Sequence, residues 1–306
     1  MNQSDTAVKN FLVFQCYGHE GIFFECARAL LSISQRHTAE EIQQFEIWIY
    51  TDNPEWFRQF SDCPLKLWFR TIDSDTIKKW KGSIDFVHRV KIEVLKDFCQ
   101  TKQGNVIYAD TDVEVTKSLI PMWKRIEAGK LYMHTYEGYV HHELNPIFKK
   151  LNVFLKTGNA PKYDGNLLNE CMMWNAGVLG FHTNQQHILE QVLQFTDSVY
   201  TQFPKHIVEQ FAFSVYFQKT GKLHTALPYF LHYWNLKEIR PVLKSFFEHF
   251  KGKEWESQVQ LSGAIQMFDL MLQKNTFERE KTVMGKLGGK KWESPAYDWN
   301  YIESLL

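Results

Sequence analysis

Short apolar runs alternate with segments of helical periodicity through the first third of the chain. The pattern predicts strands at residues 11–15, 45–51, 65–70 and 105–109. Apolar residues at helical spacing predict helices over 20–36 and along a face that runs from Phe86 to Phe98. Strands that alternate with helices are typical of an open, largely parallel sheet. In such sheets, ligands bind at the carboxyl ends of the strands.

The second half of the chain continues this pattern less regularly. Further strands are expected at 130–134, 176–181 and 229–234, and helices over 206–218 and after a cap at Thr183 or Asn184. After about Arg240 the pattern becomes helical, and then polar and rich in Gly and Lys at 285–291. We therefore expect one domain over residues 1–240 and a helical extension over 241–306 that packs on it.

Composition places the chain among globular proteins. The 306 residues are 44% apolar and 23% charged, which is ordinary, but 15% are aromatic, with ten Trp. Sugar rings stack on aromatic faces, although a large aromatic core explains most of these residues. Lys plus Arg equal Asp plus Glu, 35 each, so there is no overall field to attract nucleic acid.

The cysteines and the apolar segments indicate in which compartment to expect the protein. The five cysteines are odd in number and form no CxxC pair, which argues against a disulfide framework and a zinc site and favours reduced thiols. The N-terminus lacks a basic region followed by an apolar run, and no stretch approaches eighteen consecutive apolar residues. We therefore expect a cytoplasmic protein with at most peripheral membrane contact.

Two carboxylates follow the strand at 105–109. Asp110 and Asp112 stand two residues apart at its end, and we expect Asp112 to be exposed there. Carboxylate oxygens at this spacing suit a hard cation such as Mg²⁺ or Mn²⁺. That cation can bridge to a diphosphate and offset charge on a leaving phosphate. An isolated D-x-D is also common in solvated turns, and the strand before it favours the metal site.

Three later segments also carry candidate chemistry. Asn175-Ala176-Gly177 precedes a buried strand, and Glu209-Gln210 opens an amphipathic helix. His232 and Lys237 lie at the end of a late strand. Each has a structural interpretation: a turn, a solvated helix face and a packing segment, respectively.

In this order, the segments resemble the family of retaining GT-A glycosyltransferases that includes glycogenin and bacterial lipopolysaccharide galactosyltransferases. The resemblance covers about residues 10–240. It implies a Rossmann-like nucleotide-sugar-binding α/β fold with a mixed, largely parallel central sheet and helices on both faces. It also implies Mn²⁺ or Mg²⁺ as cofactor and a nucleotide-sugar donor, with a UDP-sugar favoured. The metal ligands that it implies are Asp110, Asp112 and His232. The pair beside the reacting carbon would be Glu209 and Gln210. The donor contacts would be Tyr17, Arg89, Asp110, Thr111, Asn175, Ala176, Gly177 and Lys237.

The chain departs from this family in several places. Glu209 replaces an aspartate, and Lys237 follows His232 by five residues without the accompanying Gly or Pro-Trp. Residues 85–89 are also similar to a mannosyltransferase-type family with a comparable D-x-D, so both retention and inversion of the sugar stay open. Arg89 has an alternative role in a salt bridge to Asp85, four residues earlier on the helix.

The acceptor is expected to be a glycan or a lipid-linked hydroxyl. The tail at 286–292 mixes cations with an aromatic residue and could touch a lipid headgroup, but a solvated tail is favoured. The polar loop at 157–170 is a candidate lid or a plain connection. Two other functions stay open: a haloacid-dehalogenase-like phosphohydrolase that uses Asp110 and Asp112, and a catalytically silent module that binds nucleotide or glycan.

Overall fold

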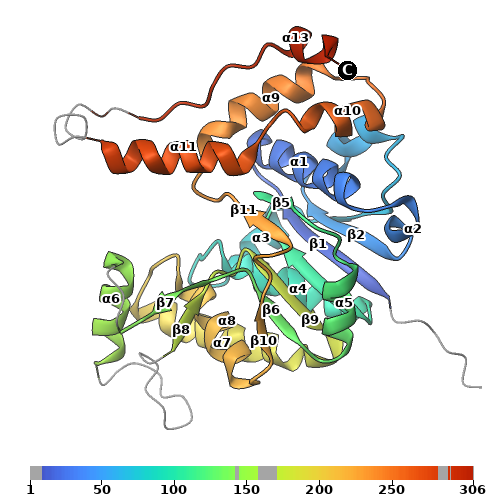
Figure 1. The fold of residues 1–306 in the computed structure, drawn as a ribbon. Coiled ribbons are helices and arrows are strands. Elements are labelled where there is room, and N and C mark those ends of the chain that lie inside the picture. The colour runs from blue at the N-terminus through green and yellow to red at the C-terminus, as the bar shows by residue number, and fades with distance from the viewer. Residues whose placement is uncertain (1–8, 142–144, 158–170, 282–288, 290, 306) are drawn as a thin grey trace, which may run out of the picture.

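A computed structural model describes residues 9–141, 145–157, 171–281, 289 and 291–305. A seven-stranded sheet forms its centre, in the order β10-β6-β9-β4-β1-β2-β3 (Figure 1). The strands are β1 (Asn10–Cys16), β2 (Phe45–Thr51), β3 (Leu67–Thr71), β4 (Asn105–Ala109), β6 (Leu131–Met133), β9 (Val178–His182) and β10 (Leu223–Thr225). The β9 strand runs antiparallel to both of its neighbours, and the other pairs are parallel. This confirms the predicted mixed, largely parallel sheet.

Helices cover both faces of the sheet, as predicted. They are α1 (Glu20–Arg36), α2 (Ala39–Ile42), α3 (Ser74–Lys81), α4 (Arg89–Thr101), α5 (Ile120–Glu127), α6 (Pro146–Leu155), α7 (His187–Gln202), α8 (Val208–Lys219), α9 (Arg240–His249), α10 (Trp255–Ser262), α11 (Met267–Glu280) and α13 (Trp299–Ser304). Within the described ranges, every helix is too short or too polar to span a bilayer.

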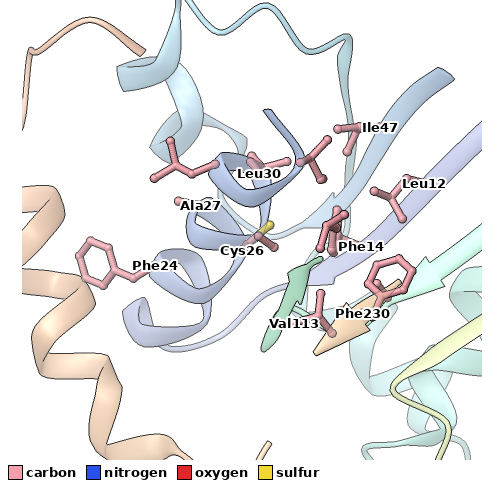
Figure 2. Packing of buried hydrophobic residues seen from close by; sticks show 14 of the residues in the cluster. Leu12, Phe14, Phe24, Cys26, Ala27, Leu30, Ile47, Val113 and Phe230 are labelled. Atoms are coloured by element: carbon pink, nitrogen blue, oxygen red, sulfur yellow. The ribbon is translucent and has the colours of Figure 1, made fainter. Parts of the chain in front are cut away.

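The central strands divide their side chains between two cores. Successive side chains of a strand point to opposite faces. In β1, Leu12 and Phe14 therefore join the core under α1, whereas Phe11 and Val13 join the core under α4, α7 and α8. Figure 2 shows Cys26 of α1 beside Phe14 in the first of these cores. Burial on both faces explains why these strands read as continuous apolar runs.

Two small antiparallel sheets flank the carboxyl ends of the central strands. One pairs β5 (Val113–Val115) with β11 (Phe230–His232), and the other pairs β7 (Tyr136–Tyr139) with β8 (Met172–Trp174). In the first sheet His232 lies opposite Val113, directly after Asp112. Val113 and Phe230 also enter the core under α1 (Figure 2). The packed core thus fixes a late segment beside the D-x-D motif.

The C-terminal helices share the core under α1. Figure 1 shows α9 and α10 beside α1, where Phe24 stacks on Phe247 with ring centroids 5.7 Å apart. Arg28 is buried, and its guanidinium lies 3.4 Å from both Ser262 Oγ and the Ile265 carbonyl oxygen. It also pairs with Glu114 at 3.2 Å. The division at residue 240 remains a proposal, and the two parts have one continuous apolar interior.

Several element boundaries differ from the predicted ones. The helix expected from a cap at Thr183 or Asn184 begins at His187, because Thr183–Gln185 forms a 3₁₀ turn in which the Asn184 N–H donates to His182 Nδ1. The helical face was expected to start at Phe86, but the helix α4 begins at Arg89. Residues 158–170 of the candidate lid lie outside the described residues, as do residues 286–288 and 290 of the tail at 286–292.

Candidate active site

The two aspartates lie where β4 meets the start of β9. The Asp110 N–H donates to the Gly177 carbonyl at 2.8 Å, which joins the D-x-D motif to the Asn-Ala-Gly segment. The Tyr108 hydroxyl donates to Asp110 Oδ1 at 2.8 Å. Asp112, expected to be exposed, is only 7% exposed, because β11 and the segment that follows cover it. That expectation was wrong.

Asp110, Asp112 and His232 form a group that could hold a metal ion, since one ligand atom from each lies within 4.8 Å of the others. His232 Nδ1 is 2.9 Å from Asn175 Oδ1, which already accepts the Gly177 N–H. An amide oxygen only accepts, so we assign the imidazole proton to Nδ1. Nε2 then faces Asp112 Oδ1 at 3.1 Å and Asp110 Oδ2 at 3.9 Å. Three acceptors that converge in this way fit a divalent cation.

Lys237 places a positive charge beside the Asp112 carboxylate. Its Nζ lies 2.5 Å from Asp112 Oδ2 and 3.4 Å from Glu25 Oε1. The buried Glu25 also binds the Arg240 guanidinium, at 2.8 and 3.1 Å. Burial alone would raise the pKa of Asp112, but His232 in its charged form, which donates from Nε2, and Lys237 outweigh it and hold this pKa well below its usual range.

A second buried ion-pair network lies behind Asp110. Lys91 projects from α4, and its Nζ lies 3.3 Å from both Asp110 Oδ1 and Glu209 Oε1 and 3.0 Å from the Ala176 carbonyl oxygen. Burial would lower the pKa of Lys91, but Asp110 and Glu209 raise it. Burial, aided by Asp110 and opposed by Lys91, raises the pKa of Glu209 to about 7.

Arg89 forms its ion pairs away from Asp110 and Asp112. Its guanidinium binds Asp197 at 2.8 Å, Glu93 at 2.8 Å and the Trp80 carbonyl at 2.6 Å. Among the described residues, Arg89 pairs with Glu93 and Asp197 and not with Asp85, which pairs with Lys81 at 3.4 Å. The cation from this helix that reaches the candidate site is Lys91, two residues later.

Glu137 links two of the predicted segments. Its Oε1 accepts from Asn175 Nδ2 at 3.0 Å, and its Oε2 accepts from Gln210 Nε2 at 2.6 Å. These bonds fix both amide groups and orient Asn175 Oδ1 toward His232. Glu137 belongs to the short strand β7, where no sequence pattern indicated a functional residue.

Two adjoining cavities meet at the aspartates. The larger, about 580 Å³, is also lined by Glu137, Asn175, Glu209, Gln210 and Trp234. The smaller, about 250 Å³, is lined by Gln15, Tyr17, Thr111 and Arg240. The residues common to both are His88, Lys91, Asp110, Asp112 and Lys237. The structure thus brings together every predicted site residue except Arg89.

Sequence reasoning missed Lys91, Glu137 and Arg240. Lys91 did carry a signal, because it shares the apolar face of its helix with Val94, Leu95 and Phe98. A lysine on such a face is seldom buried without a partner. Arg240, at the first turn of α9, had no comparable mark in the sequence.

No protein-family model matches the sequence, and no curated protein matches it either. Among solved structures, the chain is similar to mouse xyloside xylosyltransferase 1, at 12% identity over 72% of this chain and 85% of that one, with a TM-score of 0.47. It is also similar to the Streptococcus pneumoniae glycosyltransferase GlyE, at 13% identity over 85% of this chain and 64% of that one, with a TM-score of 0.48. The galactosyltransferase LgtC, solved with donor and acceptor sugar analogues, shows 14% identity over 71% and 73%, with a TM-score of 0.45.

These solved structures are glycosyltransferases, the class that the motifs resemble. At such identities and TM-scores they say nothing about which reaction this chain performs. The architecture is established by the molecule itself: an α/β fold whose mixed, largely parallel sheet carries the candidate site at the carboxyl ends of its strands.

Proposed function

We propose that the protein is a metal-dependent glycosyltransferase that uses a nucleoside diphosphate sugar, with a UDP-sugar favoured. One observation carries the proposal: Asp110, Asp112 and His232 converge from separate segments at the junction of two cavities. A divalent cation held there by these residues would offset the charge that develops on the leaving diphosphate. The ion that we expect is Mn²⁺ or Mg²⁺.

The two cavities suit the two parts of such a donor. We assign the nucleoside to the smaller one, beside Tyr17 and Thr111, and the sugar to the larger one. Lys237 lines both and carries a compact positive charge, which suits the diphosphate between them. Asn175, Ala176 and Gly177 would contact the donor sugar.

In the proposed reaction, an acceptor hydroxyl oxygen bonds to the anomeric carbon of the donor sugar. The bond from that carbon to the diphosphate oxygen breaks, the hydroxyl proton is released and the nucleoside diphosphate leaves. Glu209 and Gln210 are our candidates for contacts at the reacting carbon, and Glu137 orients Gln210 through a 2.6 Å bond. We expect a cytoplasmic protein whose acceptor is a glycan or a lipid-linked hydroxyl.

Calorimetry with UDP and GDP tests the proposal. We expect UDP to bind in the presence of Mn²⁺ and to bind at least tenfold more weakly in chelator, because the carboxylates repel a diphosphate that no cation bridges. Equally tight binding in chelator would contradict the proposed metal role. Release of UDP from a panel of UDP-sugars, measured beside phosphatase substrates, distinguishes transfer from the phosphohydrolase activity and from a silent binding module.

A further inference from the structure

Trp234 is an exposed tryptophan on the wall of the larger cavity. It is 57% exposed, although Tyr233 before it and Leu236 after it are fully buried. Among the described residues, the other Trp, Tyr or Phe that lines this cavity is Phe148, at 2% exposed. Trp234 therefore offers the open aromatic face of this cavity.

The backbone that carries Trp234 is firmly held. The Tyr233 N–H donates to the Asp112 carbonyl at 2.9 Å, and the Leu236 N–H donates to the Tyr233 carbonyl at 2.8 Å. From α11, Lys274 donates to the Asn235 carbonyl and pairs with Glu238 at 2.6 Å. A ring on a braced turn loses less conformational freedom when a ligand covers it.

Trp234 lies on the sugar side of the proposed site. It lines the larger cavity and not the smaller one, which holds Tyr17 and Arg240. It also sits between His232 and Lys237 in the sequence, so its turn follows directly from the metal group. An acceptor that approaches the donor sugar from this cavity passes beside the indole.

Most of the other residues that line the cavity are polar, although Ile147, Phe148 and Ile207 line it as well. The polar residues include Glu137, Asn145, His206 and Gln210. A pyranose ring matches such a wall, because its C–H face is apolar and slightly positive while its hydroxyl edge forms hydrogen bonds. The C–H face suits the negative face of an aromatic ring, and the hydroxyls suit carboxylate and amide groups.

We propose that Trp234 is the stacking platform for a pyranose ring of the acceptor, and hence that the acceptor is a glycan. This inference rests on the proposed glycosyltransferase function. An acyl chain would gain little here, because it would desolvate the charged and amide groups of the wall without forming hydrogen bonds with them.

Saturation-transfer NMR with methyl glucosides, methyl galactosides and lactose tests the inference on the full chain with UDP and Mn²⁺ present. We expect saturation to reach the ring C–H protons of at least one of these sugars. Trp234→Ala should weaken its binding about tenfold and Trp234→Phe less, because a phenyl ring keeps part of the stacking face. Trp68→Ala is the matched control, since Trp68 is also exposed, at 51%, but lies on β3 outside this cavity.

The outcomes separate this inference from the function on which it rests. If calorimetry finds metal-dependent UDP binding but none of these sugars binds, or Trp234→Ala binds them as tightly as the wild type, the inference fails and the proposed function stands. The same holds if a serine peptide or an octyl chain binds in their place. If metal-dependent UDP binding itself is missing, the proposed function fails and the inference falls with it.

Discussion

Gly177 packs so closely against the His232 ring that a Cβ at residue 177 would lie 2.2 Å from His232 Cε1. The contact follows from the hydrogen bonds that hold both residues: Asn175 Oδ1 accepts the Gly177 N–H and lies 2.9 Å from His232 Nδ1. A glycine is therefore needed here because of space, and the imidazole has no room to move toward β9.

We expect Gly177→Ala to displace the His232 ring and weaken Mn²⁺-dependent UDP binding by at least tenfold, the usual size of effect when the orientation of a metal ligand is lost. Calorimetry with UDP and Mn²⁺ measures this. Far-UV circular dichroism checks that the sheet still forms. An unchanged affinity for UDP would show that His232 does not contribute to the metal site.

Asp112→Asn keeps the shape of the side chain but removes the charge that faces His232 and Lys237. We expect at least a tenfold loss of Mn²⁺-dependent UDP binding, with a loss of about 1–2 kcal/mol in the free energy of unfolding. Urea unfolding and calorimetry on the same samples give both values.

The control for this change is Asp97→Asn. Asp97 also accepts a hydrogen bond, from the Tyr50 hydroxyl at 2.8 Å, and pairs with Arg70 at 3.3 Å, but it lines neither cavity at the aspartates. Asp97→Asn should lower the free energy of unfolding and leave UDP binding intact. Similar losses of UDP affinity in both variants would argue against a specific role of Asp112.

Lys91→Met should leave Asp110 and Glu209 without their shared counterion. Breaking a buried ion pair from one side costs about 3 kcal/mol. Lys96→Met is a matched control on the same helix, because Lys96 pairs with Glu190 at 2.6 Å at a partly exposed site, where such a pair contributes about 1 kcal/mol or less. Met and Lys have similar helix propensities, so the helix itself is little affected. Equal losses in urea unfolding would contradict the buried network.

His37 makes the stability depend on pH. Burial lowers the pKa of this histidine, whose Nε2 accepts the Leu119 N–H at 2.9 Å while Nδ1 lies 2.9 Å from the Ile33 carbonyl. The unfolded chain binds this proton more readily. The contribution of His37 is therefore complete above about pH 6.5 and declines as the pH falls below it.

We expect His37→Gln to flatten the fall in unfolding free energy between about pH 7.5 and pH 5, because the amide oxygen can accept the Leu119 N–H without titrating. Urea unfolding at several pH values measures the slope. His187→Gln, at the exposed start of α7, should keep the wild-type slope. A slope that His37→Gln leaves unchanged would assign the pH dependence to other groups.

The central strands could be predicted from sequence because burial on both faces makes them apolar throughout. Residues 45–51 and 105–109 are strands with the predicted bounds. The direction of β9 could not be predicted, because the alternation of side chains is the same in parallel and antiparallel strands. The cap at Thr183 failed because His182 satisfies the turn before the helix begins.

The candidate site, too, could be predicted from the sequence only in part. Asp110 follows the end of β4 and Asn175 precedes the start of the antiparallel β9, so these two meet at one edge of the central sheet, whereas His232 reaches them from β11 in a separate sheet. Arg89 was predicted on the helix that also carries Lys91, but it lines neither cavity. Two residues correspond to about 200° around a helix, so Arg89 and Lys91 face in nearly opposite directions. Only packing decides which of the two turns toward the aspartates.

The buried Arg28 guanidinium has a consequence for synthesis of the chain. Its partner Glu114 is separated from its other partners, Ser262 and Ile265, by about half the chain length. Ser262 and Ile265 are synthesised late. A nascent chain that ends before residue 262 would have to leave this cation partly unpaired in an apolar interior or keep α1 away from the sheet. We therefore expect Asp110, Asp112 and His232 to become ordered only after the C-terminal helices have left the ribosome, so that the proposed site forms after synthesis of this segment and not domain by domain.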